Sequence, residues 1–375
     1  MALASSQRAA LQHVASRVRH QRASARARII DSLHRAGCSV AAFDSALECV
    51  RAHARVVIHF HPDRLGFKQM LVAEALLEDG IYRNQFETGL STGGLFPVAG
   101  SQRDSWEREL FGGAYQVDTV THSERPKYGA LELVRYADGP IPRFGSCYFV
   151  LRQAVSSRAS FTFAGSEDPR ASERVGTIDM LDAVMAALLD EIEGGGMAAP
   201  PWPPFRAPTL GVPTLTIARV LQLFQDLAHP RKDPSHLEPG RVLDTQVEAQ
   251  VHGPIDLRED VELLVADPAF AETSTGSTLR ALATRYDVSL CWHAGFQLAV
   301  RDVPDDFRGA EMPRLARRIA GDDGIINAAV IGAAEASLHR KPEEWRNWGT
   351  RAETLQHLKQ LWHVLVHYGS AVEHR

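Results

Sequence analysis

The spacing of apolar residues changes twice along the chain. In residues 1–54, alanine, valine and leucine recur every three to four positions, which predicts helices. Between residues 128 and 163 the apolar residues are aromatic or β-branched and stand in short runs, YGALELVRY, GSCYFVLR and ASFTF, which predicts strands. Helical spacing returns beyond residue 271, interrupted by the strand-like run VSLCWHAGFQLAV. We therefore expect an α+β protein with a central mixed sheet and helical segments at both ends.

Three segments follow from this pattern. The first is a basic helical segment over residues 1–54, the second is a mixed α+β core over 55–270, and the third is a mostly helical segment over 271–375. The length of 375 residues agrees with two or three domains. Inside the core, a tract rich in glycine and proline at 194–212 predicts a linker or a surface loop.

Composition narrows the class of protein. With 45% hydrophobic residues, 23% charged residues and a net charge of −5, the chain has the profile of a globular protein and no overall basic charge that would predict nucleic-acid binding. No apolar run is long enough to span a membrane, and the four cysteines are scattered, so we expect a cytoplasmic location, with export as an effector as the alternative. Residues 1–35 differ in charge, because seven arginines stand against one acidic residue, Asp31. This segment predicts either a solvated helix or a contact with a polyanion.

The predicted first strand, RVVIHF, runs into the polar sequence HPDR, and three interpretations of it stay open. Side chains alternate along a strand, so His59 and His61 would share a face and could begin the metal site of a hydrolase if His252 joined them. Alternatively, Arg64 presents a rigid fork of donors that suits phosphate, so this segment would hold an anionic cofactor. In the third interpretation, the polar residues simply end the strand.

A second polar pattern lies in QVEAQVHG. Gln246, Glu248 and Gln250 stand two residues apart and would share one face of a strand. Such a stripe is common on an edge strand that faces solvent. A carboxylate in this place can also hydrogen-bond a ribose hydroxyl and stabilise the oxocarbenium-like transition state of a sugar-cleaving reaction.

The Gln-Val-Glu sequence resembles the Gln-x-Glu motif of ADP-ribosyltransferases, in which the second acid is catalytic and the first residue orients the acceptor. The segment LRQAVSSRASFTFAGSED is similar to the Arg-x-Thr-Phe-Thr segment of toxin-associated domains of the transferase type. The order Arg64, then Ser160 and Thr162, then Glu248 follows that of the Arg-Ser-Glu transferase class, although this chain has no Ser-Thr-Ser triplet.

This resemblance implies a sheet of the ADP-ribosyltransferase type and an enzyme that cleaves the nicotinamide–ribose bond of NAD and transfers ADP-ribose. Glu248 would be the catalytic acid, and Gln246 would orient an acceptor that could be a protein, a nucleic acid or a small molecule. No metal is expected. The alternatives are the metal-dependent hydrolase and a non-catalytic interaction module. In the transferase, the residues that contact NAD would be His59, His61, Arg64, Tyr128, Arg158, Ser160 and Thr162.

A broader resemblance is carried by the motifs HFHPDR, QFETG, RPKYGAL and EAQVHG. Together they are similar to a bacterial domain family of unknown function. This resemblance covers most of residues 56–310 and implies no particular chemistry.

Overall fold

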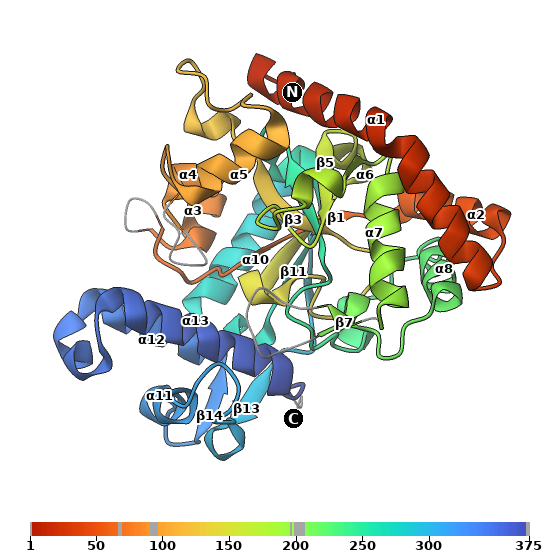
Figure 1. Cartoon of the computed structure of the whole chain (residues 1–375). Coiled ribbons are helices and arrows are strands. Elements are labelled where there is room, and N and C mark those ends of the chain that lie inside the picture. The colour runs from red at the N-terminus through yellow and green to blue at the C-terminus, as the bar shows by residue number, and fades with distance from the viewer. Residues whose placement is uncertain (1, 67–69, 91–96, 196, 199–206, 373–375) are drawn as a thin grey trace.

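An eight-stranded sheet forms the centre of the computed structural model, which describes residues 2–66, 70–90, 97–195, 197–198 and 207–372 (Figure 1). The strand order is β12-β11-β4-β1-β3-β9-β5-β6. β11 and β12 run parallel, whereas all other neighbours in this sheet run antiparallel. The expectation of an α+β protein with a mixed central sheet and helices at both ends is confirmed.

The strands of this sheet are short. Their bounds are β1 (Val56–Phe60), β3 (Lys127–Leu131), β4 (Cys147–Leu151), β5 (Ala159–Phe163), β6 (Val175–Thr177), β9 (Val247–Val251), β11 (Val261–Ala266) and β12 (Ser289–Trp292).

Six shorter strands pair in twos outside the main sheet. They are β2 (Ile81–Tyr82) with β10 (Ile255–Asp256), β7 (Met197–Ala198) with β8 (Ala207–Pro208), and β13 (Gln297–Ala299) with β14 (Ile325–Asn327). The predicted linker or loop at 194–212 contains β7 and β8, and residues 196 and 199–206 of that tract lie outside the described residues.

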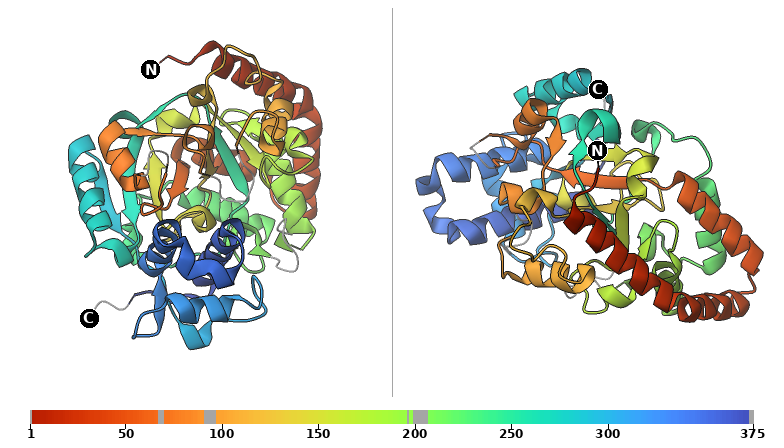
Figure 2. Two further views of the ribbon diagram at one scale, coloured as in Figure 1. Left: turned by 90° about the vertical axis from the view of Figure 1, so that its left-hand side faces the viewer. Right: turned by 90° about the horizontal axis from the view of Figure 1, so that it is seen from above.

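Helices surround the sheet. In chain order they are α1 (Ser5–Arg35), α2 (Val40–His53), α3 (Val72–Asp79), α4 (Gln85–Thr88), α5 (Gln102–Phe111), α6 (Gln153–Ser156), α7 (Asp182–Glu193), α8 (Ile217–Asp226), α9 (Leu257–Asp260), α10 (Ser274–Tyr286), α11 (Met312–Ile319), α12 (Ala328–Arg340) and α13 (Arg351–Tyr368). The N-terminal helix α1 and the C-terminal helices α12 and α13 lie on opposite sides of the molecule (Figures 1 and 2).

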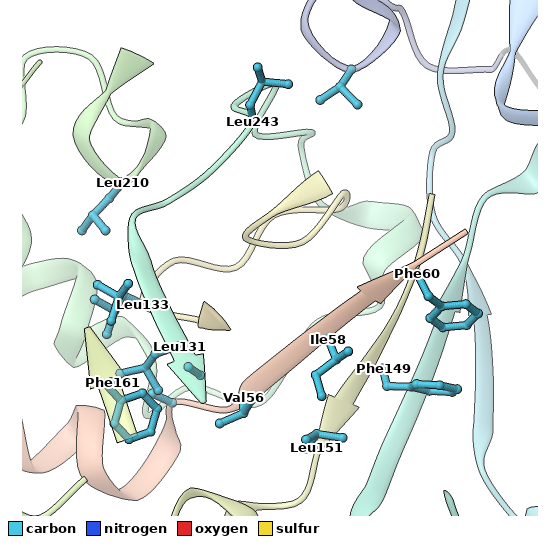
Figure 3. Packing of buried hydrophobic residues seen from close by; sticks show 14 of the residues in the cluster. Val56, Ile58, Phe60, Leu131, Leu133, Phe149, Leu151, Phe161, Leu210 and Leu243 are labelled. Atoms are coloured by element: carbon cyan, nitrogen blue, oxygen red, sulfur yellow. The ribbon is translucent and has the colours of Figure 1, made fainter. Parts of the chain in front are cut away.

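One face of the sheet is apolar. Val56, Ile58 and Phe60 alternate along β1 toward this face, and Phe60 stacks on Phe149 of β4 with ring centroids 4.8 Å apart (Figure 3). These side chains belong to a large buried cluster that also includes residues of α1, α2, α7, α8, α10 and α13, so all three segments expected from the sequence share it. Burial of each large apolar side chain stabilises the fold by about 1.5–3 kcal/mol.

The opposite face of the sheet is partly polar. Antiparallel pairing places Val57 beside Ala130 and Ala130 beside Glu248, so these three residues share one face of the sheet. Because side chains two positions apart lie on the same face, His59 of β1 and Gln250 of β9 also lie on it. The sheet therefore has an apolar side that forms the core and a side on which polar residues gather.

The arginines of α1 contribute to its docking on the rest of the chain. Arg22, Arg26, Arg28 and Arg35 form ion pairs with acidic residues of α2 and α7, and the apolar face of α1 carries buried residues such as Ile29. Much of the basic charge noticed in residues 1–35 thus has partners within the protein. None of the described helices is long and apolar enough to cross a membrane.

Candidate active site

A cavity of about 900 Å³ lies where β1 and β3 separate. The two strands pair at Val56–Leu131 and Val57–Ala130. A Cβ atom on Gly129 would lie 2.4 Å from the carbonyl oxygen of Val57, so glycine is needed for this close approach of the strands. Beyond the paired positions, the cavity is lined by the end of β1, the start of β3, the start of β9, and parts of α3, α5 and α13.

Glu248 lines this cavity with one carboxylate oxygen held in place. Its Oε1 accepts a hydrogen bond from the backbone N–H of Ser166 at 3.0 Å and another from Nε2 of Gln250 at 2.9 Å. In the parts of the chain that the structure describes, no donor meets hydrogen-bond geometry at Oε2, although the Ser166 side chain also lies near the carboxylate and favours its ionised form. The fixed oxygen orients the carboxylate, and the other oxygen is available to a ligand.

A buried chain of hydrogen bonds supports Gln250 from behind. Its Nε2 also donates to Thr162 Oγ1 at 2.8 Å, and its Oε1 accepts from Ser160 Oγ at 2.8 Å. Ser160 Oγ lies 3.2 Å from Nε2 of His252, whose Nδ1 lies 2.5 Å from the hydroxyl of Tyr115. Ser160 and Thr162 are completely buried and do not line the cavity. Ser160 and Thr162, expected to contact NAD, are therefore placed where they support the residue that orients Glu248.

The environment of Glu248 makes its protonation sensitive to pH near neutrality. Burial and the nearby carboxylate of Glu167 raise the pKa of Glu248 to about 7. Burial and the charge of Asp244 also raise the pKa of Glu167. Arg143, from the 3-10 turn Pro142–Phe144, lies 3.1 Å from Asp244 and 3.9 Å from Glu167. At neutral pH, Glu248 exists in both forms, which suits proton transfer as well as charge stabilisation.

Gln246 lines the cavity but does not belong to the strand. β9 begins at Val247, and Gln246 has a left-handed backbone with φ of 71°. Its backbone N–H donates to Asp244 Oδ1 at 2.6 Å, and its carbonyl oxygen accepts from the backbone of Ala164 at 2.7 Å. The expected stripe of three residues on one strand is thus wrong at Gln246. A left-handed non-glycine residue beside a cavity is typical of functional sites.

His59, on β1, and His61, just beyond its end, line the cavity as neutral rings. His59 stacks on Tyr148 at 4.9 Å, and its Nδ1 lies 3.0 Å from the carbonyl oxygen of Gly145. His61 follows the end of β1 and meets the edge of Trp362 at 5.1 Å. Burial lowers the pKa of His59 to about 3 and that of His61 well below its usual value. These rings can donate or accept hydrogen bonds with a ligand, but they supply no positive charge at neutral pH.

The two arginines expected to contact NAD have different positions. Arg64 lines the cavity and pairs with Glu335 of α12, with Nε and Oε2 3.3 Å apart. Arg158 pairs with Asp260 at 2.8 Å and donates to the carbonyl oxygen of His252. Because Arg158 does not line the cavity, its expected contact with NAD does not match its position.

Tyr128, which was expected to contact NAD, forms part of the cavity wall. Its hydroxyl donates to Glu107 Oε1 at 2.8 Å, and the guanidinium of Arg103 lies over its ring, 5.5 Å from the centroid. Glu107 is itself held by Arg125 at 2.8 Å. The ring is thus fixed at its hydroxyl end and covered by a cation on one side.

The sequence interpretation missed a group of basic residues on the cavity wall. Lys359 and His363 stand one turn apart on α13, and Arg308 precedes α11. His363 is buried. The spacing of Gln356, Lys359, Gln360 and His363 on one helical face was the available sequence signal.

The histidines proposed for a metal site do not gather in one place. His252 contacts Tyr115 and Ser160 instead of the histidines at the end of β1. Within the described ranges, no group of three His, Cys, Asp or Glu side chains is arranged to hold a metal ion. The structure therefore does not bring His252 to His59 and His61, as the hydrolase alternative requires.

A sequence model described as "Protein of unknown function (DUF3626)" matches residues 55–368. The chain belongs to the DUF3626 family. The match begins directly before β1 and ends with α13, so the DUF3626 region includes every residue that lines the cavity. A search of curated proteins gives no match.

Proposed function

We propose that this protein is an enzyme of the ADP-ribosyltransferase type, which binds NAD in the cavity and cleaves the nicotinamide–ribose bond beside Glu248. The observation that carries the proposal is Glu248 itself, because Oε1 is fixed by two donors while Oε2 is available within a large cavity. Basic residues line the same cavity, as an anionic dinucleotide requires. The mixed central sheet, with Glu248 on β9, is compatible with a transferase sheet.

Bond cleavage releases nicotinamide with the electron pair of the C–N bond, and positive charge develops on the ribose. Ionised Glu248 would accept a hydrogen bond from a ribose hydroxyl and stabilise this charge more in the transition state than in the ground state. An acceptor nucleophile then forms the new bond to the ribose carbon, and its proton passes to a carboxylate. Gln246, which lines the cavity, would orient that acceptor.

The test measures nicotinamide release and NAD affinity for wild-type protein and for Glu248→Gln. The variant retains the side-chain shape but loses the charge, so NAD should bind almost as in wild type while turnover falls by ~10²-fold or more. Glu238→Gln, at an exposed position, is the matched control and should retain activity. The Gln246→Ala variant should retain slow NAD hydrolysis but transfer poorly to an acceptor.

The proposal fails if wild-type protein neither binds NAD nor releases nicotinamide with cell extract supplied as a source of acceptors. It also fails if Glu248→Gln turns over NAD as fast as the Glu238→Gln control.

A further inference from the structure

The basic residues of the cavity come from separate parts of the chain and surround the same cavity as Lys359. The side chains whose charges act on Lys359 are those of Arg64, Arg103, Arg143 and Arg308. Arg64 follows β1, Arg103 lies on α5, Arg143 lies in the turn before β4, and Arg308 precedes α11. All of them line the cavity. The fold thus brings positive side chains together in one place, although like charges repel.

Internal carboxylates neutralise only part of this group. Arg64 pairs with Glu335, and Arg143 pairs with Asp244. Among the residues that the structure places, Lys359, Arg103 and Arg308 form no ion pair within 4.0 Å of a carboxylate, although the charge of Arg103 also acts on Glu107, Glu167 and Glu248. The Nε atoms of Arg103 and Arg308 are also buried without a hydrogen-bond partner there. Buried donors and charges without partners are costly, so they mark a place where a ligand supplies the missing acceptors.

The backbone at Arg308 is also unusual. Arg308 has a φ of 66°, a left-handed conformation that is uncommon for a residue with a side chain. Its guanidinium lies over the ring of Phe307, 5.2 Å from the centroid. Such conformations concentrate at sites that bind ligands. The position of Arg308 on the cavity wall is therefore set by a local backbone constraint and by ring packing.

We propose that Lys359, Arg308 and Arg103 form a subsite for the diphosphate group of the substrate. This inference rests on the proposed function, because it places the diphosphate of the same dinucleotide whose ribose lies at Glu248. A single carboxylate would be satisfied by one arginine, as Glu335 is by Arg64. A diphosphate carries more charge and more acceptor oxygens, so it can satisfy a lysine and two guanidinium groups together.

The subsite has a distinctive proton linkage. Burial, together with the charges of the four arginines, lowers the pKa of Lys359 to about 7. His61 and His363 also face Lys359, and their pKa values are well below their usual value. A bound anion favours the protonated amine and raises the pKa of Lys359. Above pH 7, binding should therefore take up a proton at Lys359, and affinity should fall as pH rises.

Calorimetric titration of the full chain with inorganic pyrophosphate and with ADP-ribose tests this proposal. At pH 8, measurements in buffers of different ionisation enthalpy give the number of protons taken up. Lys359→Met should weaken both ligands about tenfold or more and remove most of the proton uptake. Lys341→Met changes a lysine that is 62% exposed and pairs with Glu344, so it should bind both ligands like wild type.

Arg308→Met provides a second variant, which should weaken binding but retain most of the proton uptake, because burial is the largest cause of the lowered pKa of Lys359. Thermal melting without ligand checks that each variant folds, and Lys359→Met should be no less stable than wild type because it removes an uncompensated charge. Unchanged affinity and unchanged proton uptake in folded Lys359→Met would overturn the subsite. Binding of pyrophosphate at Lys359 without nicotinamide release would leave the subsite standing and reject the proposed function. If Lys359→Met turned over NAD like wild type, the proposed function would stand and the subsite would be rejected.

Discussion

Gln250 holds Glu248 through its side-chain amide. Nε2 of Gln250 donates to Glu248 Oε1 at 2.9 Å, while Oε1 of the same amide accepts from Ser160 at 2.8 Å. Because the amide is completely buried, no solvent replaces these bonds if it is removed. The orientation of the candidate catalytic carboxylate thus depends on a residue behind it.

Gln250→Leu should therefore change both stability and protonation. It leaves buried partners unsatisfied, which costs about 1–3 kcal/mol of unfolding free energy. The hydrogen bond from Gln250 favours the ionised carboxylate, so its loss should raise the pKa of Glu248 and move the pH profile of turnover upward. Urea denaturation and pH-dependent nicotinamide release measure the two effects. Gln222→Leu, at an exposed position on α8, should change neither the unfolding free energy nor the pH profile. A Gln250→Leu protein with wild-type stability and an unchanged pH profile would contradict the prediction.

A second prediction concerns the pH dependence of stability. Burial raises the pKa of Glu248 from 4.5 to about 7, so its contribution to stability is complete below pH 4.5 and is lost as pH rises toward 7. Glu248→Gln removes this dependence. The difference in unfolding free energy between variant and wild type should grow in favour of the variant by up to about 3 kcal/mol between pH 5 and pH 8. Urea denaturation at both pH values measures it, with Glu238→Gln as control. A constant difference would show that Glu248 ionises at its ordinary pKa.

A third prediction concerns the buried ion pairs beside Tyr128. Arg125 lies 2.6 Å from Asp104 and 2.8 Å from Glu107, and all three side chains are almost fully buried. Arg125→Met leaves two buried carboxylates without their cation and should cost about 3–5 kcal/mol. The loss should be larger at pH 8 than at pH 5.5, because burial raises the pKa of Glu107 to about 7 and protonation removes its charge at the lower pH.

Arg108→Met is a close control for this experiment. Arg108 approaches the same Asp104 at 3.9 Å but is 64% exposed, so its removal should change stability by less than about 1 kcal/mol. Denaturation curves for the two variants at both pH values give the comparison. Similar losses for both would mean that burial of the ion pair is unimportant.

A fourth prediction concerns the basic N-terminal helix. Four arginines of α1 already pair with acidic residues, so retention on heparin should be weak and should be lost at modest salt. Arg19 is exposed, and Arg19→Ser should remove part of the remaining retention without altering thermal stability. Elution only at high salt, unaffected by Arg19→Ser, would indicate another polyanion surface.

A fifth prediction concerns metals. Because the proposed reaction uses a carboxylate and cationic side chains, protein purified without added metal should contain less than one equivalent of zinc, iron or manganese. Chelators should leave its melting temperature unchanged. A full equivalent that is lost on His59→Ala or His61→Ala would favour the hydrolase instead.

The sequence predicted the strands that position the site because their apolar residues are concentrated in short runs. β1, β4, β5 and β9 all lie within the predicted stretches. It also singled out Glu248, whose charge stands out in an apolar strand and which lines the cavity. Sequence could not tell whether a polar residue on a strand faces a cavity or a buried neighbour. The resemblance to transferases placed Ser160 and Thr162 at NAD, and the strand pattern could not test that expectation. That difference depends on what covers the sheet.

Lys359 was missed for a related reason. A helix with apolar residues on one side and Gln356, Lys359 and Gln360 on another looks like a helix with a solvated polar face. Only packing shows that this face lines a cavity with Arg308 and Arg143. Contacts between residues so far apart along the chain leave no periodicity in the sequence that would reveal them.

The cavity wall combines early and late parts of the chain, so the site is complete only late in synthesis. The ribosome makes β1 early and α13 late, yet His59 and Lys359 line the same cavity. A nascent chain that has not been translated past α13 lacks one wall of the site, and so does a product truncated before it. If the cavity binds a nucleotide of the cell, incomplete chains cannot consume it.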